Sequence, residues 1–218
     1  AIIIEPIQAT SGFNSVNNNF LKQIKLLATK SSCLLIFDEV WTGFGKTGYD
    51  FAYQYYKIKP DILILGKALG GGMPLGLVAF NEPLDHNYAG AQSSTFQGNI
   101  ISIHNSYFFL KYLKKLNYLK KVKIIENFMT SQKKLLLSFN SVNNFFGIGN
   151  MWGLEINLDY KKGTDLTNLI RSELLQEGLI TWECGVKGNV IGLIPPICSK
   201  KSSLDLSIHI LTKILIKF

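Results

Sequence analysis

Two charged residues in the first half of the sequence could do chemistry together. Asp38 follows the apolar residues 34–37, and Lys67 follows the apolar residues 62–65 after one glycine. A lysine amine condenses with an aldehyde to form a Schiff base, and an aspartate can keep a pyridinium nitrogen protonated so that the ring accepts electrons. The pair therefore indicates an imine-forming cofactor, and pyridoxal phosphate needs both groups.

Both residues are expected at one edge of a parallel sheet. Short apolar runs bounded by polar or glycine turns predict buried strands at residues 1–4, 34–37, 62–65 and 75–80. Apolar residues at helical spacing, with Asn14 and Ser15 as caps, predict a helix between the first two runs, and this order implies a parallel strand pair. Because ligands bind at the carboxyl edge of open α/β sheets, Asp38 and Lys67 are predicted to face one crevice.

The second half of the chain follows a different pattern. Two helices, at residues 100–116 and 118–137, are expected after the first strands, and the remainder predicts strands at residues 151–156 and 190–194 and helices at residues 164–176 and 202–216. Strands and helices in this order describe a small α+β domain. We therefore predict that residues 1–116 belong to a larger sheet domain and that residues 117–218 form a small C-terminal domain.

Composition narrows the class of protein. The chain has 218 residues, and its 47% hydrophobic content can close a core, which excludes a disordered chain. No apolar run approaches the roughly 18 residues of a membrane helix, and no secretory signal is recognisable, so we expect a cytoplasmic protein without membrane contact. The net charge is +8, but Arg171 is the only arginine in the sequence. Nucleic-acid-binding sites favour arginine over lysine. We read the lysines as a solvated coat and predict no nucleic-acid partner.

Cysteine and histidine residues form no metal or disulfide pattern. The cysteines are odd in number and include no C-x-x-C pair, and the histidines are not clustered. These residues are Cys33, Cys184, Cys198, His86, His104 and His209. We predict no metal site, and we expect reduced thiols in the core.

Several motifs resemble, in order and spacing, the class III pyridoxal-phosphate-dependent aminotransferases, the ω-aminotransferase group. They are EPIQ at residues 5–8, LLIFDEV at 34–40, TGFGKTG at 42–48, PDI at 60–62, GKALGGG at 66–72, TFQGN at 95–99, GNMWGLE at 149–155 and GNVI at 188–191. The resemblance covers nearly the whole chain and corresponds to the C-terminal portion of the family's sequence. It implies a fold-type I architecture, a mostly parallel large-domain sheet plus a small C-terminal domain, and homodimers that share active sites.

The resemblance also assigns roles to individual residues. Lys67 matches the Schiff-base lysine, which also moves the substrate proton, and Asp38 matches the partner of the cofactor's pyridine nitrogen. Val40, expected on an extended segment on the same side as Asp38, is similar to the valine that packs on the ring, and Glu5 matches a glutamate near the cofactor. Thr95 resembles the threonine that reaches the phosphate of the neighbouring subunit. The alternatives are core packing for Val40 and, for Thr95, a cap of the helix near residue 99.

Three positions depart from the family's pattern. Trp41 stands where the family commonly has a glutamine that hydrogen-bonds the cofactor's ring oxygen, and we include Trp41 among the cofactor-contacting residues, although an indole N–H only donates. Gly192 stands where an arginine usually takes the substrate carboxylate, and only Lys187 lies nearby as a replacement. Thr10 replaces the glutamate that pairs with that arginine. The loss of both partners leaves no unpaired buried charge.

The family's N-terminal section, which carries the loop that cradles the cofactor phosphate, would precede Ala1. We therefore treat the chain as a fragment of a transaminase. The predicted reaction moves the terminal amino group of a diamine or ω-amino acid to a 2-oxo acid. The family resemblance implies that this acid is 2-oxoglutarate. Acetylornithine, ornithine, 4-aminobutyrate and diaminobutyrate aminotransferases are all candidates, and residues 85–92 look somewhat like the diaminobutyrate enzymes.

Two other readings stay open at this point. One is an aminomutase or racemase of the same fold, which keeps the amino group on its substrate and for which the loss of the carboxylate arginine is mildly encouraging. The other is an inactive truncated subunit that serves only as an interaction partner. A requirement for a 2-oxo acid separates the first alternative from a transaminase.

Overall fold

The computed structural model describes residues 1–85, 88, 90, 94–160 and 163–218, and part of the stretch at residues 85–92 lies outside the described residues. The chain divides into two compact units. The first contains Ala1–Pro6, Val16–Gly45 and Tyr49–Tyr118, and the second contains Ile7–Ser15, Lys46–Gly48 and Leu119–Phe218. The domains expected at residues 1–116 and 117–218 stay a prediction.

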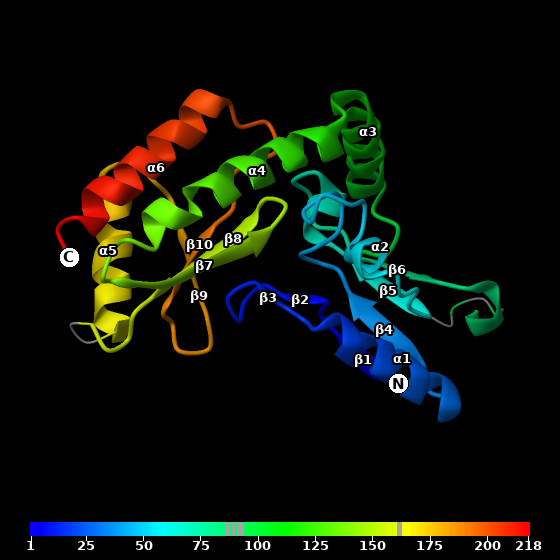
Figure 1. The fold of residues 1–218 in the computed structure, drawn as a ribbon. Coiled ribbons are helices and arrows are strands. Elements are labelled where there is room, and N and C mark those ends of the chain that lie inside the picture. The colour runs from blue at the N-terminus through cyan, green and yellow to red at the C-terminus, as the bar shows by residue number, and fades with distance from the viewer. Residues whose placement is uncertain (86–87, 89, 91–93, 161–162) are drawn as a thin grey trace. The chain divides into compact units, whose positions relative to one another are not determined.

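A four-stranded sheet forms the first unit's framework (Figure 1). Its order is β1 (Ile2–Ile4), β4 (Leu35–Asp38), β5 (Ile62–Leu65) and β6 (Leu77–Phe80). The pairs β1–β4 and β4–β5 are parallel, and β5–β6 is antiparallel. All four apolar runs are confirmed as strands, and the parallel pairs bring the carboxyl ends of β1, β4 and β5 to one edge.

Helix α1 (Asn18–Lys30) connects β1 to β4 and packs on this sheet through Leu21 and Ala28, which are buried beside Leu35 and Phe37. The predicted helix is confirmed, but the predicted caps Asn14 and Ser15 are wrong. Asn14–Ser15 form strand β3, which pairs with β2 (Ile7–Gln8), and the Asn17 side chain caps the helix by accepting from two backbone N–H groups.

Short helices and one long helix complete the first unit. They are α2 (Ala52–Tyr56), the 3₁₀ turns η1 (Lys67–Gly70) and η2 (Glu82–Leu84), and α3 (Ile100–Leu116). Leu113 of α3 is buried with Leu65 and Leu69, so α3 is fixed to the segment that carries Lys67. The helix ends where Asn117 adopts a left-handed conformation at φ 48°, which explains the predicted break before the next helix.

The second unit is built on an antiparallel sheet with the order β7-β8-β10-β9 (Figure 1). Its elements are α4 (Tyr118–Leu136), β7 (Val142–Ile148), β8 (Met151–Ile156), α5 (Gly163–Gln176), β9 (Trp182–Cys184), β10 (Val190–Leu193) and α6 (Lys201–Leu215). Side chains of the sheet and of the three helices share one apolar core. The four predicted helices α3 to α6 and the strands β8 and β10 are confirmed, and β7 and β9 escaped the sequence analysis.

The segment Ile7–Ser15 joins this second unit. The Gly185 N–H donates to the Thr10 carbonyl at 3.0 Å, and a Cβ added at Gly12 would lie 3.2 Å from the Val190 side chain. Residues from the start of the chain therefore pack on β10 and on the turn before it. Among the described residues, no helix is both long enough and apolar enough to cross a lipid bilayer.

Candidate active site

Lys67 lies directly after β5 and Gly66, as the first residue of η1. Its backbone is in the left-handed region at φ 44°, which a non-glycine residue adopts only at a cost of about 1–2 kcal/mol. The Lys67 side chain is exposed, yet desolvation of the amine lowers its pKa. The carboxylates of Asp38 and Glu5 act in the opposite direction and raise this pKa. The strained backbone thus presents an amine that loses its proton more readily than an ordinary lysine.

Asp38 is the last residue of β4 and pairs in register with Ile64 of β5. Its Oδ1 atom accepts a hydrogen bond from the Val40 N–H at 2.9 Å, which turns the chain immediately after the strand. The expectation of an extended segment at Val40 is therefore wrong. The Val40 side chain instead packs against Gly66, where an added Cβ would lie 3.4 Å from Val40 Cγ1.

Three strand ends thus supply the charged groups of the candidate site. Glu5 follows β1, Asp38 ends β4, and Lys67 follows β5. Both carboxylates lie close enough to the amine to act on its pKa. This arrangement agrees with the prediction that Asp38 and Lys67 lie at the carboxyl edge of the parallel strands.

Trp41 contributes its ring face to the same cluster. The Lys67 Nζ atom lies over this ring, 4.4 Å from the ring centroid, which is the distance of a cation–π contact. The sequence identified Trp41 only as a substitute for a hydrogen-bonding glutamine. The contact between the two side chains was not predicted, because nothing in the spacing of residues 41 and 67 indicates it.

Thr95 lies in an exposed turn before α3. The cap of α3 is Asn99, whose side chain accepts from the Ser102 N–H at 3.0 Å, so the helix-capping alternative for Thr95 is wrong. Among the described residues, no hydrogen bond joins Thr95 to the lysine cluster. Its proposed contact is with a neighbouring subunit, and it stays a prediction.

Glu39 is a structural residue of the site that the sequence analysis missed. Its side chain is fully buried, and burial raises the pKa of its carboxyl group. It accepts hydrogen bonds from the backbone N–H groups of Ala52 at 2.5 Å and Tyr53 at 2.8 Å and from the Thr42 hydroxyl at 3.0 Å. Glu39 therefore caps α2 and fixes the turn that follows Asp38. The sequence shows a second carboxylate next to Asp38, but neither its burial nor its hydrogen-bond partners.

The donor set fits pyridoxal phosphate. Formation of a covalent bond to an aldehyde needs a nucleophilic amine, and a protonated pyridine nitrogen needs a fixed carboxylate. Lys67 supplies the first, and Asp38, held by the Val40 N–H, supplies the second. Among the described residues, no three His, Cys, Asp or Glu side chains gather into a group that could hold a metal ion.

In the second unit, Gly192 lies in the middle of β10, paired with Gly153 of β8 and Trp182 of β9. A Cβ added there would lie 3.1 Å from the Phe13 ring, 3.2 Å from the Trp182 carbonyl oxygen and 3.4 Å from Cys184 Sγ. Phe13 is buried and fills the space that a longer side chain at Gly192 would enter. The position of the family's carboxylate-binding arginine is thus closed by local packing.

We expect Gly192→Ala to destabilise the protein by about 1–3 kcal/mol, because the carbonyl oxygen on β9 cannot move aside as a flexible side chain could. The double variant Gly192→Ala with Phe13→Leu is expected to be less destabilised than the sum of the two single variants. Gly76→Ala is the control, because its Cβ would meet only the Leu65 carbonyl oxygen at 4.0 Å. Urea unfolding curves measure the difference, and a Gly192→Ala midpoint equal to wild type would contradict the packing argument.

Arg171 is the only arginine in this chain. Its guanidinium forms an ion pair with Glu183 at 2.8 Å and also donates to the Asn168 side chain. The prediction of core thiols is confirmed for Cys184, which is buried, and is wrong for Cys198, which is exposed. Cys33 is partly buried and packs against the core of the first unit.

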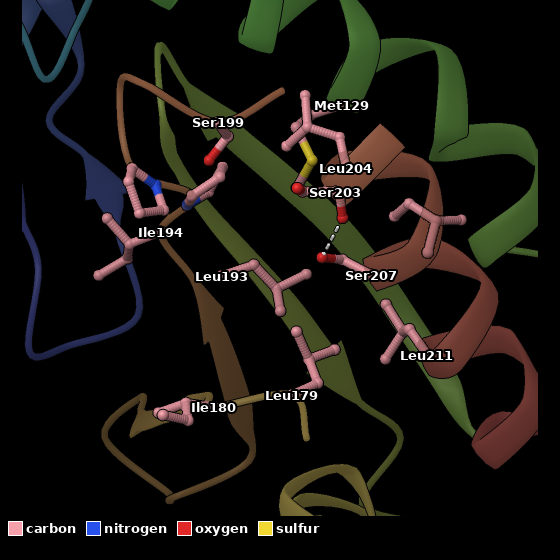
Figure 2. Close-up of a pocket in the computed structure, with 13 residues that line it drawn as sticks. Met129, Leu179, Ile180, Leu193, Ile194, Ser199, Ser203, Leu204, Ser207 and Leu211 are labelled. Atoms are coloured by element: carbon pink, nitrogen blue, oxygen red, sulfur yellow. Dashed lines mark hydrogen bonds between the residues drawn. The ribbon is translucent and has the colours of Figure 1, made fainter. Parts of the chain in front are cut away.

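A separate pocket of about 370 Å³ lies in the second unit (Figure 2). Its wall is mainly apolar with a row of serines on and before α6, and the Ser207 hydroxyl donates to the Ser203 carbonyl. Among its lining residues are Leu179, Leu193, Leu211, Ser199, Ser203 and Ser207. Because neither a lysine nor a carboxylate lines this pocket, it cannot perform the chemistry of the Lys67 cluster.

The proteins that this chain resembles in sequence and in structure include aminotransferases. Acetylornithine aminotransferase from Methanocaldococcus jannaschii is 31% identical over 218 residues, which cover 98% of this chain and 52% of that protein. The solved structure of ornithine aminotransferase from Plasmodium yoelii superposes with a TM-score of 0.88 at 30% identity and covers 98% of this chain and 56% of that one. The chain thus spans about half the length of the relatives it matches.

A third relative links the fold to the cofactor. Ornithine aminotransferase from Toxoplasma gondii, described with partial occupancy of pyridoxal phosphate at its active site, has a TM-score of 0.88 at 26% identity, and the match covers 99% of this chain and 50% of that one. These neighbours have the fold-type I architecture of pyridoxal-phosphate enzymes. The family model Aminotransferase class-III matches residues 1–215, and the chain therefore belongs to the class-III aminotransferase family.

Proposed function

We propose that the chain is the lysine-bearing part of a transaminase that moves the terminal amino group of a diamine or ω-amino acid to a 2-oxo acid, with 2-oxoglutarate as the acceptor. The observation that carries this proposal is the cluster of Lys67, Asp38 and Glu5 at adjoining strand ends in a chain of this family. The names of the relatives, acetylornithine and ornithine aminotransferase, support a donor with a terminal amine.

The cofactor of the family is pyridoxal 5'-phosphate, which supplies an aldehyde and an electron-accepting pyridinium ring when bound. Lys67 would hold this group through Nζ, and its amine would serve as the base that moves the proton at the substrate carbon. Asp38 would keep the ring nitrogen protonated, and Val40, which packs beside Gly66, would contact the ring. Glu5 adds negative charge next to the amine.

The specificity of this transaminase is proposed to differ from that of relatives with an arginine on β10. At Gly192 the packing of Phe13 leaves no room for such a side chain, and Arg171 is already paired with Glu183. A substrate carboxylate must then be bound by other groups, of which Lys187 on the turn before β10 is the candidate from this chain.

The complete enzyme needs more than the residues of one such chain. The remaining half of the relatives' length is proposed to supply the phosphate cradle, and Thr95 is proposed to reach the phosphate bound by a second subunit of a homodimer. A cytoplasmic location is proposed as well, and the three unpaired cysteines are consistent with a reducing compartment.

The test is a half reaction. The purified chain, alone and co-expressed with the other half of a related aminotransferase, is loaded with pyridoxal phosphate and mixed with ornithine, N-acetylornithine, 4-aminobutyrate or 2,4-diaminobutyrate. Conversion of the cofactor to pyridoxamine phosphate, measured by chromatography, and its reversal by 2-oxoglutarate are the expected results. Isomerised substrate without any need for a 2-oxo acid would indicate a mutase or racemase instead. Absence of conversion in the complemented protein would contradict the transaminase proposal.

A further inference from the structure

We propose that Trp41 is a positioning residue for Lys67. Whenever the Lys67 amine is not bonded to an aldehyde, the face of the Trp41 ring holds the Lys67 ammonium group. The observation is the distance of 4.4 Å between Lys67 Nζ and the Trp41 ring centroid. The inference deepens the function proposed for Lys67 and rests on it, but the contact itself can be tested without any cofactor.

The backbone brings the two side chains together from different strands. Trp41 lies in the turn fixed by the hydrogen bond from the Val40 N–H to Asp38, and Lys67 lies in the left-handed position after β5. Both positions are anchored on adjoining parallel strands, so the contact depends on the sheet and not on a mobile loop. Trp41 is half-buried, which limits the water that competes for the ammonium group.

The Trp41 ring restricts the position of the Lys67 ammonium group, which the neighbouring carboxylates do not. The charged groups that act on the amine are Asp38 at the end of β4 and Glu5 after β1, and their attraction depends mainly on distance. An indole attracts a cation only over its face, and among the aromatic side chains it does so most strongly. Trp41 therefore fixes where the nitrogen rests, whereas the carboxylates mainly favour its charge.

A consequence for reactivity follows from the same contact. A ring face stabilises the ammonium form and not the neutral amine, so it opposes loss of the proton that condensation with an aldehyde requires. Trp41→Leu keeps an apolar side chain beside the lysine but removes the ring face. We expect this variant to condense with an aldehyde about two- to fivefold faster at neutral pH, which corresponds to the strength of an exposed cation–π contact.

The first experiment observes the contact directly by NMR. Reductive methylation with ¹³C-formaldehyde labels every lysine of the purified chain, and Lys67→Arg identifies the Lys67 resonance by its loss. We expect the wild-type methyl resonance to be shifted upfield by the ring current of Trp41, to move to the position of exposed lysines in Trp41→Leu, and to be intermediate in Trp41→Phe. A wild-type resonance at the exposed position, or one that Trp41→Leu leaves unmoved, would overturn the inference.

The second experiment measures reactivity at the same residue. Pyridoxal phosphate bonded to lysines is trapped with borohydride, and the labelled peptides are quantified by mass spectrometry over time. Lys67 is expected to be labelled faster in Trp41→Leu, while exposed Lys120 on α4 is labelled at an unchanged rate. Circular dichroism checks the fold, and Trp41→Phe, with a smaller expected increase, replaces Trp41→Leu if the latter does not fold. Equal rates in folded variants would overturn the inference.

The two proposals fail differently. If Lys67 shows the ring-current shift but is never labelled by pyridoxal phosphate, the transaminase role of the lysine is lost and the contact stands. If Lys67 is labelled normally but its resonance is unshifted, the transaminase role stands and the positioning role of Trp41 is lost.

Discussion

Lys67→Ala is expected to abolish the covalent attachment of pyridoxal phosphate and, in a complemented enzyme, to lower transamination by at least about 10³-fold. The variant removes both the nucleophile that bonds the aldehyde and the base that moves the substrate proton, and a positioned base alone contributes about 10²–10⁴-fold. No other amine in the described structure is shown next to both Asp38 and Glu5. Absorbance at the short-wavelength edge of the visible range and trapping with borohydride measure the attachment of pyridoxal phosphate.

The chain offers a matched control for this variant. Lys57 is also an exposed lysine with a left-handed backbone, at φ 55°, so Lys57→Ala has the same backbone consequences without the neighbouring carboxylates. We expect Lys57→Ala to behave as wild type. Lys67→Arg retains the positive charge but should also fail to attach the cofactor. Persistent attachment in Lys67→Ala at a single other lysine would show that the wrong residue has been assigned.

Glu39→Ala is expected to lower the free energy of unfolding by about 3–5 kcal/mol, a large part of the total stability of a protein of this size. The variant leaves the buried N–H group of Ala52 and the partly buried N–H group of Tyr53 without an acceptor, and a buried donor without an acceptor costs about 1–3 kcal/mol. The cap of α2 is lost together with the hydrogen bond from Thr42. Chemical denaturation followed by circular dichroism measures the change.

Two further variants show whether the hydrogen bonds are responsible. Glu39→Gln keeps one oxygen acceptor and nearly the same shape, so it should lose less stability than Glu39→Ala. Asp205→Ala removes an exposed carboxylate from α6 and should change stability by no more than about 0.5 kcal/mol. If Glu39→Ala were as stable as Asp205→Ala, the capping role of Glu39 would be refuted.

The sign of the pH dependence at Glu39 follows from its raised pKa. The folded state binds this proton more tightly than the unfolded state, so the contribution of protonated Glu39 to stability is present in acid and is lost as the pH rises through the folded-state pKa. The hydrogen bonds from the Ala52 and Tyr53 N–H groups and from the Thr42 hydroxyl oppose this rise in the pKa of the carboxyl group but do not cancel it. The free energy spent on burying the Glu39 carboxyl group is therefore part of the free energy needed to fix the turn after Asp38.

The elements around the site were predictable because their signals are local. The apolar runs before Asp38 and Lys67 were long enough to indicate strands, and the periodicity of residues 100–116 gave α3 with its observed ends. The chemistry was also predictable, because an aspartate and a lysine at two strand ends restrict the possible cofactors. Motif resemblance then selected the family that the comparisons show.

Other features depend on contacts that no local pattern contains. Glu39 reaches backbone groups 13 and 14 positions away, and the Trp41 ring meets a lysine from another strand. Strand β7 was missed because its buried residues do not alternate and its pairing shifts between Val142 and Asn144. The caps Asn14 and Ser15 looked suitable, but Asn17 occupies the position from which a side chain reaches the first free N–H groups.

The placement of the segment Ile7–Ser15 in the second unit has a consequence for biosynthesis. Gly12 packs against Val190, which is 178 positions later in the chain. At the usual speed of translation, roughly 10–35 seconds pass between the synthesis of these two residues. During that interval Phe13, which is buried in the finished fold, has not met Gly192 of β10. The nascent chain therefore carries an apolar segment that a chaperone can bind until β10 leaves the ribosome.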